Sequence, residues 1–290
     1  MSAWLATARA IHLGSLMIIF GGSAYAALLQ QAGLGAPPAK RLRWLFGTAA
    51  VFALASGIAW FCMIAGQMSG SWKGALDPAT LELTGSATRF GHIFLPRLIG
   101  LVALCAVCVV PRRRNGIALP ILAGLLLVSL APVSHAAASD NDSAILGAAS
   151  DAAHVLAAGW WVGALAALTL MIAGRREDPA ALSASLRLFS AWGSFVVGLL
   201  VLTGVANALM ILPPAAMSLH NLYFTLLLVK VGAALLMMAL AALNRWRLAP
   251  ALQGRGTSSV LNLSRSVGVE LVLGLVIVGI VGYLGTMAPH

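Results

Sequence analysis

The sequence predicts an all-α polytopic membrane helical bundle. Hydrophobic residues make up 60% of the chain and charged residues only 9%, whereas soluble domains carry about 25% charged residues. The apolar residues form long runs rather than the short alternating segments of a transmembrane barrel. A surface this poor in charge cannot face water over most of its area, so the composition excludes a cytosolic enzyme, a disordered protein and a disulfide-rich scaffold.

Eight apolar runs approach or exceed the length of about 20 residues that a helix needs to cross a bilayer. We expect them to form one integral membrane domain over residues 1–290. The first run is interpreted as a true helix rather than a cleaved signal, because it is long and holds only Arg9 as a cation near its start. The outer segment 69–91 is the longest loop and is expected to form a small cap. The predicted transmembrane helices are 3–29, 42–68, 92–111, 116–135, 144–174, 183–212, 219–249 and 264–288.

Lys and Arg residues mark every second loop. They follow the first, third, fifth and seventh predicted helices, while the opposite loops hold few cations. Because basic loops stay on the cytoplasmic side, both termini are predicted to lie on the outer, periplasmic side. The net charge of +10 is then explained by membrane topology. We expect the lipid bilayer as a partner and no nucleic acid.

All six histidines fall in the outer half of the predicted membrane or at its outer face. His12 and His154 lie well inside their helices, whereas His92 opens one helix and His135 closes another. Ionisable side chains inside a membrane are costly and are functional candidates, although any single buried histidine is also explained as a hydrogen-bonded core residue. Their common side favours a shared metal site.

Two thioethers lie on the same side, at Met63 and Met68 near the outer end of the second predicted helix. Imidazole and thioether together favour copper. Zinc would accept the same histidines, and the carboxylate-rich cage of a calcium or magnesium site is missing from the sequence pattern. The predicted ligands of a copper ion are His12, His92, His135, His154, Met63 and Met68.

Other polar groups lie inside the predicted helices. Arg97 and Asp151 have matching depths and are predicted to form an ion pair. The sequence identifies no partner for Lys230 or Glu270.

The chain carries three cysteines, all within apolar runs, so no disulfide framework is expected. Cys105 and Cys108 share one helix face and either receive Cu(I) near the inner end or pack as small apolar side chains. Because a Walker loop, a dinucleotide fingerprint and a nucleophile elbow are all missing from the sequence, we expect a protein that is not an enzyme.

An ordered set of short motifs resembles the copper resistance protein D (CopD/PcoD) family. No single motif is specific, but their order along the chain is. The matching segments are RAIHLG at 9–14, SHA at 134–136, GWWVG at 159–163 after His154, FS at 189–190, GVAN at 204–207, and AALNR at 241–245 after Lys230.

The resemblance implies a multi-pass protein of the bacterial inner membrane that handles copper. It implies import of copper ions from the periplasm to the cytoplasm, with a separate periplasmic CopC-type carrier that delivers the metal. His12, His135 and His154 match the motif positions and are the ligands that the resemblance supports. His92 is added because of its depth alone.

Two other functions remain open from the sequence. A haem- or quinone-linked membrane redox protein would use paired histidines, such as His12 with His154 or His92 with His135. A copper-holding membrane protein without transport would need the same outer metal site as a transporter.

Overall fold

The computed structural model describes residues 1–34, 39–109, 116–131, 143–174, 179–212, 217–252 and 257–287. These residues fold as long helices joined by short connections. The helices are α1 (Ser2–Gln31), α2 (Ala39–Met68), α3 (Pro78–Ala87), α4 (Arg89–Val109), α5 (Ala118–Val128), α6 (Ser143–Gly174), α7 (Pro179–Ile211), α8 (Leu222–Leu243), the π-helix η5 (Asn244–Leu248), α9 (Ala249–Ala251) and α10 (Thr257–Leu284).

Seven helical stretches within the described residues are long and apolar enough to cross a membrane. They are α1, α2, α4, α6, α7, α10 and the continuous stretch from α8 to α9, and each coincides with a predicted transmembrane helix. The remaining predicted helix, 116–135, contains α5, which has only 11 residues and a length of about 16 Å. Residues 132–135 lie outside the described part of the chain, so an eighth span stays a prediction.

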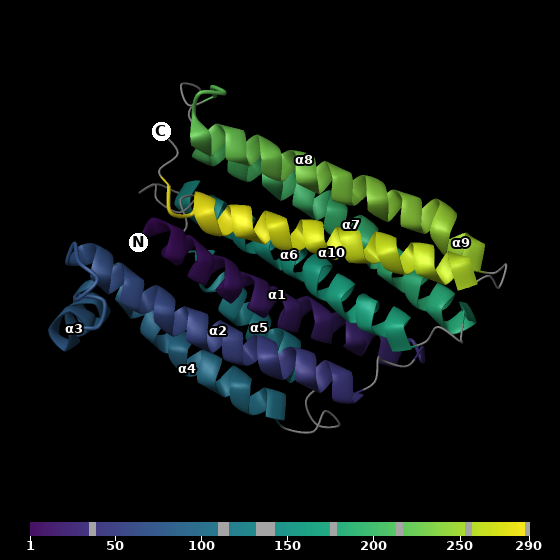
Figure 1. Cartoon of the computed structure of the whole chain (residues 1–290), viewed down its shortest axis with the longest axis horizontal. Helices are drawn as coiled ribbons and strands as arrows, with labels where there is room; N and C mark the ends of the chain where they lie inside the picture. The colour runs from purple at the N-terminus through teal and green to yellow at the C-terminus, as the bar shows by residue number, and fades with distance from the viewer. Residues whose placement is uncertain are drawn as a thin grey trace.

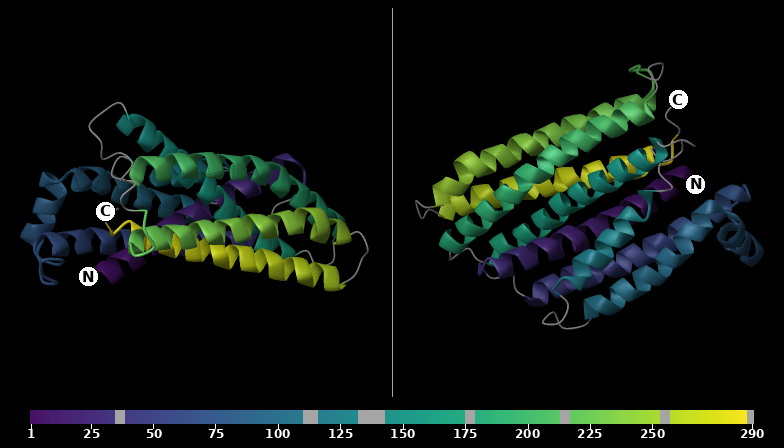
Figure 2. Two further views of the ribbon diagram at one scale, coloured as in Figure 1. Left: turned by 90° about the horizontal axis from the view of Figure 1, so that it is seen from above. Right: turned by 180° about the vertical axis from the view of Figure 1, so that it is seen from behind.

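Helices α1 and α6 run through the middle of the bundle (Figure 1). Helices α2, α4 and α5 lie on one side of this pair, and α7, α8 and α10 lie on the other. The start of α1 and the end of α10 lie at the same end of the bundle, as Figure 2 also shows. This agrees with the prediction that both termini share one side, whereas the membrane face to which that side belongs stays a prediction.

Glycines allow the backbones of α1 and α6 to touch. A Cβ atom built on Gly21 would lie 2.3 Å from the carbonyl oxygen of Gly159, and one built on Gly163 would lie 2.3 Å from the carbonyl oxygen of Met17. Small residues at such positions let membrane helices approach closely and gain dispersion contacts. The two central helices are therefore joined by a contact that no larger residue can make.

We expect Gly21→Ala to destabilise the bundle by about 1–3 kcal/mol, because the added methyl group must push two backbones apart. Thermal unfolding of the purified protein in detergent measures the change. Gly198→Ala on α7 is the matched control, since a Cβ there meets nothing within 4 Å and alanine raises helix propensity by up to about 1 kcal/mol. Equal melting temperatures for the two variants would show that the α1–α6 contact does not limit stability.

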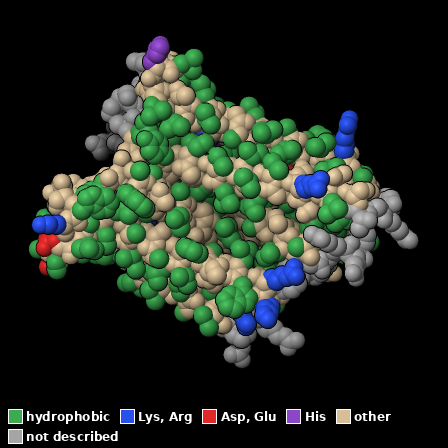
Figure 3. All heavy atoms as spheres, viewed as in Figure 1, with side chains coloured by type: hydrophobic (Ala, Val, Ile, Leu, Met, Phe, Trp, Pro, Cys, Tyr) green, Lys and Arg blue, Asp and Glu red, His purple; other side chains and the backbone are tan. Residues whose placement is uncertain are grey.

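Large hydrophobic side chains cover the outside of the bundle (Figure 3). Ile99, Leu202 and Trp246 are among many that are well exposed, as expected for surfaces that contact lipid. In Figure 3, Lys and Arg side chains gather mainly toward the end where α9 lies, and acidic side chains appear at the end where α3 lies. This distribution agrees with the loop pattern from which the orientation was predicted.

The predicted cap of segment 69–91 is helix α3, which packs against α2 and α4. Asp77 caps its first turn by accepting hydrogen bonds from the Thr80 amide at 2.9 Å and the Thr80 hydroxyl at 2.6 Å. These two bonds lower the pKa of the Asp77 carboxyl from its ordinary value, because they stabilise the ionised form. Pro78 follows as the first helical residue, where a missing N–H costs nothing.

Candidate functional site

His12 lies fully buried where α1 meets α2 and α4. Its Nδ1 is 2.8 Å from the carbonyl oxygen of Ala53, and its Nε2 is 2.8 Å from Nη2 of Arg97. A carbonyl only accepts and a guanidinium only donates, so Nδ1 carries the proton and Nε2 accepts from Arg97. His12 is therefore a neutral imidazole with both ring nitrogens engaged. Its ring packs edge-on against Trp60, with 5.6 Å between the ring centroids.

Arg97 joins three helices through its guanidinium group. The side chain is only 3% exposed. Its Nη1 donates to the carbonyl oxygen of Leu126 and to Ser129 Oγ at the end of α5, while Nη2 donates to His12. These partners come from α1 and the α5 region, which differs from the predicted ion pair with Asp151 on α6. Equal depth along the helix axes did not show which helix faces meet.

A second guanidinium group approaches the same region. Arg9 lies over the Trp60 ring, 4.6 Å from its centroid, and both Arg9 and Arg97 act electrostatically on His12. Two positive groups beside a histidine repel a metal cation. In this arrangement His12 has no lone pair to offer a metal and sits in an unfavourable field for one.

His154 lies between α6 and α7 with a different pattern of hydrogen bonds. Its Nδ1 is 2.9 Å from Thr203 Oγ1, and the Thr203 hydroxyl donates to the carbonyl oxygen of Leu199 at 2.6 Å. Because that hydroxyl has only one proton, its oxygen accepts from Nδ1–H of His154. The Leu200 carbonyl oxygen also lies close enough to interact with the ring. With the proton on Nδ1, the lone pair of His154 Nε2 has no donor among the described residues. Gly204 leaves room beside the ring, since a Cβ there would lie 3.4 Å from His154 Cε1.

Further polar groups surround His154. Lys230 of α8 acts electrostatically on His154 and on Asp151, which lies one turn before it on α6. Ser150 Oγ and Asn207 Oδ1 are buried without a hydrogen-bond partner among the described residues. Both side chains lie about one turn toward the end of the bundle that holds the N-terminus. Polar oxygens thus extend from the histidine toward that end of the bundle.

Three further predicted ligands, His92, Met63 and Met68, lie on the α2–α4 side of the bundle. His92 is exposed, and its Nε2 is 2.6 Å from the carbonyl oxygen of Ser86, which ties α4 to α3. Met68 is 51% exposed, and its sulfur accepts a weak hydrogen bond from Thr84 Oγ1 at 3.6 Å. Met63 is partly buried and packs against the aromatic cluster of α2 and α4.

The described residues do not bring the predicted ligands into one coordination sphere. His12 and His154 belong to the two central helices, but each ring has its own partners. His135 lies outside the described residues, so its role stays a prediction. Within the described ranges, no group of three or more His, Cys, Asp or Glu side chains is close enough to hold a metal ion.

None of the three cysteines forms a disulfide. Cys108 is buried, and its sulfur donates to the carbonyl oxygen of Phe46 at 3.6 Å. Cys105 is partly buried and packs against the hydrophobic core. This packing is typical of cysteine as a small apolar residue.

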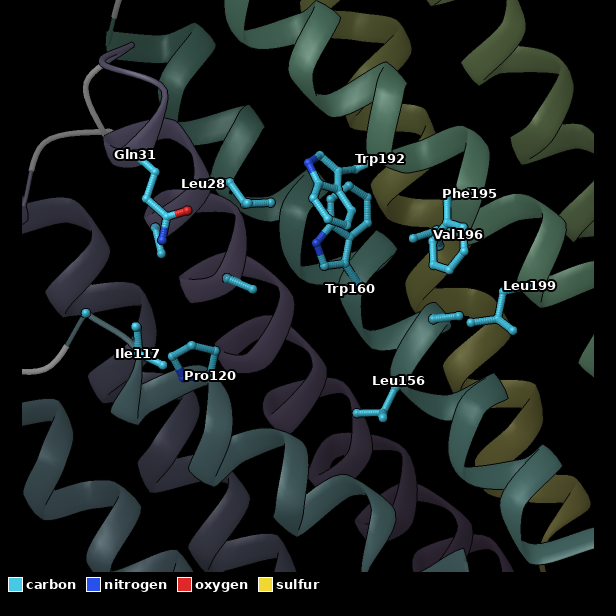
Figure 4. Close-up of a pocket in the computed structure, with 14 residues that line it drawn as sticks. Leu28, Gln31, Ile117, Pro120, Leu156, Trp160, Trp192, Phe195, Val196 and Leu199 are labelled. Carbon is cyan, nitrogen blue, oxygen red and sulfur yellow. The ribbon is translucent and has the colours of Figure 1, made fainter. Parts of the chain in front are cut away.

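A cleft of about 440 Å³ opens between α1, α5, α6 and α7. Figure 4 shows Trp160 and Trp192 side by side on its wall, with Phe195 and Leu199 nearby and Gln31 on the opposite side. The lining residues include no histidine. The cleft is therefore separate from the histidine pairs that the redox alternative would need.

Sequence reasoning missed the partners that orient the two histidines. Ala53 contributes a backbone oxygen, which carries no side-chain signal. Thr203 directly precedes the GVAN segment at 204–207, so its position next to a recognised motif was a usable signal. Arg97 was recognised as unusual for its depth but was assigned to a different partner.

Two family models match the chain. The model of the N-terminal domain of copper resistance protein D-like proteins matches residues 1–145, and the model of copper resistance protein D matches residues 183–284. No solved structure matches the chain.

Three curated relatives cover most of the chain. Inner membrane protein YebZ of Escherichia coli is 31% identical, over 99% of this chain and 98% of its own length. Copper resistance protein D of Pseudomonas syringae pv. tomato is 29% identical, over 86% of this chain and 84% of its own length. Copper transport protein CutJ of Bacillus subtilis is 28% identical, over 91% of this chain but only 50% of its own length.

Proposed function

The chain belongs to the copper resistance protein D family of multi-pass inner-membrane proteins, and we propose that it carries copper ions from the periplasm to the cytoplasm. The observation that carries this proposal is the imidazole of His154. Its ring is oriented by Thr203, and the lone pair of Nε2 has no donor among the described residues. Ligating histidines commonly have their second nitrogen hydrogen-bonded in this way.

The proposed copper site takes His154 as its first ligand and His135 as its second. Neutral imidazoles bind copper without burying further anions. Asp151 lies one turn from His154 and offsets the charge of Lys230, so a cation at this position meets less repulsion than it meets between Arg9 and Arg97.

His92 and the two methionines are proposed as an outer capture region. Met68 and His92 are exposed near α3, where an ion that arrives from the periplasm can reach them. Met63 lies one to two turns deeper on α2. A CopC-type carrier is the proposed source of the metal on this side.

His12 is proposed as a ligand only after Arg97 withdraws. The Nε2 lone pair of His12 accepts from Arg97, and one lone pair cannot serve a proton donor and a metal at once. Copper and Arg97 therefore compete for the same atom. In this proposal the hydrogen bond from Arg97 occupies His12 Nε2 until an ion is present.

Copper uptake into sealed vesicles tests the proposed transport. We expect purified protein to deliver copper to a reporter inside the vesicles, and an inside-negative potential to increase accumulation. A potential of 100 mV is worth about 2.3 kcal/mol for one positive charge, or about 50-fold at equilibrium. Vesicles without protein are the control.

Two results would contradict this function. Copper that binds the protein but never reaches the reporter would indicate a copper-holding protein without transport. A red purified protein with a Soret band would favour the haem alternative, in which the histidines bind haem iron rather than copper.

A further inference from the structure

A second buried polar cluster lies on the inward side of His154. Trp161 follows His154 by two turns on the same face of α6, about 10 Å along the helix axis. It lies close to Glu270 of α10. Glu270 in turn contacts Asn244, the residue at which α8 gives way to the π-helix η5. Such π-helical turns within α-helices are frequent at functional sites. The proposed copper path uses none of these groups.

Three atoms of this cluster are buried without a hydrogen bond. Glu270 is 1% exposed and Asn244 is 7% exposed, and Asn244 Nδ2 donates to Glu270 Oε1. The Trp161 indole lies close enough to interact with the Glu270 carboxyl, but its N–H falls short of hydrogen-bond geometry. Glu270 Oε2, Asn244 Oδ1 and Trp161 Nε1 therefore remain without partners among the described residues.

No described cation neutralises the Glu270 carboxyl. Arg245 of η5 donates to the carbonyl oxygen of Ser190 and to Ser194 Oγ on α7, while Arg247 and Arg265 are exposed. The other cationic, imidazole and carboxyl groups on the long helices packed against α10 lie nearer the opposite end of the bundle. These groups are Arg9 and His12 on α1, Asp151 and His154 on α6, and Lys230 on α8. The Tyr25 phenol on α1 donates to the carbonyl oxygen of Ser185 at 2.8 Å, and Tyr223 lies at the start of α8, toward that opposite end.

We propose that Glu270 and Asn244 form a proton-binding site, in which Glu270 is held as the neutral acid. A buried carboxylate without a cation is far less stable than the neutral carboxylic acid. A proton on Oε2 also changes that atom from an acceptor into a donor, and Asn244 Oδ1 is an acceptor without a partner. One proton thus gives a hydrogen-bond partner to both Glu270 Oε2 and Asn244 Oδ1. An oxygen of the acid can still accept a hydrogen bond from Trp161 Nε1–H.

Infrared spectroscopy of the full-length protein in lipid vesicles at neutral pH tests this site. We expect the carbonyl band of a protonated carboxylic acid in the wild-type protein, with a shift to lower frequency in D₂O. Glu270→Gln should remove this band and leave the fold intact, because an amide resembles the neutral acid in shape. Glu82→Gln is the matched control, since Glu82 is exposed on α3 and lies outside the buried cluster.

A wild-type spectrum without the acid band would overturn the proposal, as would a band that survives Glu270→Gln. If Glu270→Gln fails to fold, Asn244→Ala carries the test instead. Loss of the amide partner should shift the acid band to higher frequency, because the acid hydrogen bond is weakened. An unshifted band would show that Asn244 does not share the proton. These outcomes do not depend on copper transport, so the two proposals can fail separately.

Discussion

Replacing His154 by alanine is expected to reduce copper accumulation in cells to the level of an empty vector. This imidazole is the one predicted ligand within the described residues that is both inside the bundle and left with an available nitrogen lone pair. Alanine removes the ligand, and α6 contains no other histidine that could replace it. Cellular copper, measured by elemental analysis in a strain without its own copy of the gene, reports the effect.

A graded series separates loss of the ligand from loss of the fold. Thr203→Val removes the oxygen that accepts from His154 Nδ1–H, so we expect copper affinity to fall about 10- to 100-fold, as for other partners of metal-binding histidines. Thr169→Val is the matched control, because the Thr169 hydroxyl bonds only to the carbonyl oxygen of Leu165 on its own helix. Copper uptake at the intact rate in His154→Ala would rule out His154 as a ligand.

Replacing Arg97 by methionine is expected to destabilise the protein by about 3–5 kcal/mol, the cost of removing one member of a buried charged network. The change leaves His12 Nε2 without its donor and removes one of two side-chain donors to the Leu126 carbonyl oxygen, which also accepts from Ser129 Oγ. Thermal unfolding measures the effect. Arg265→Met, at an exposed position on α10, should change stability by no more than about 0.5 kcal/mol.

A double-mutant cycle tests whether the cost comes from the contact with His12. The His12→Leu background has no imidazole, so Arg97→Met no longer leaves a buried nitrogen without its donor. We therefore expect the two changes together to cost about 1–3 kcal/mol less than the sum of the single changes. Strictly additive costs would show that Arg97 acts through α5 alone and would remove the basis for a competition between Arg97 and copper at His12.

The transmembrane helices were predictable because their signal is local. Each of the seven candidate spans is a helix formed by an apolar run long enough to cross a bilayer, and hydropathy along the chain reports this directly. The predicted span 116–135 is different, because its described residues hold only the short helix α5, which ends at Val128. Ser129, just beyond that end, accepts a hydrogen bond from Arg97 of α4, and the eighth span stays a prediction.

The candidate site was only partly predictable. Unusual depth in an apolar run identified His12, Arg97 and His154, because ionisable groups are rare there. Depth gives a position along the helix axis, but it does not give the direction in which a side chain points around that axis. Arg97 therefore received Asp151 as its predicted partner, whereas the packing of α4 against α1 and α5 gives it His12 and Ser129.

The amino-acid sequence alone determined that this protein is a multi-pass helical membrane protein of a copper-handling family, because composition, apolar run length and motif order are properties of the chain itself. Only the tertiary structure decided which polar groups meet. That choice depends on how the helices are rotated against one another, and this rotation is set by close contacts such as Gly21 against Gly159. In the resulting arrangement His12 accepts a hydrogen bond from Arg97, His154 keeps an available nitrogen, and Glu270 is buried beside Asn244.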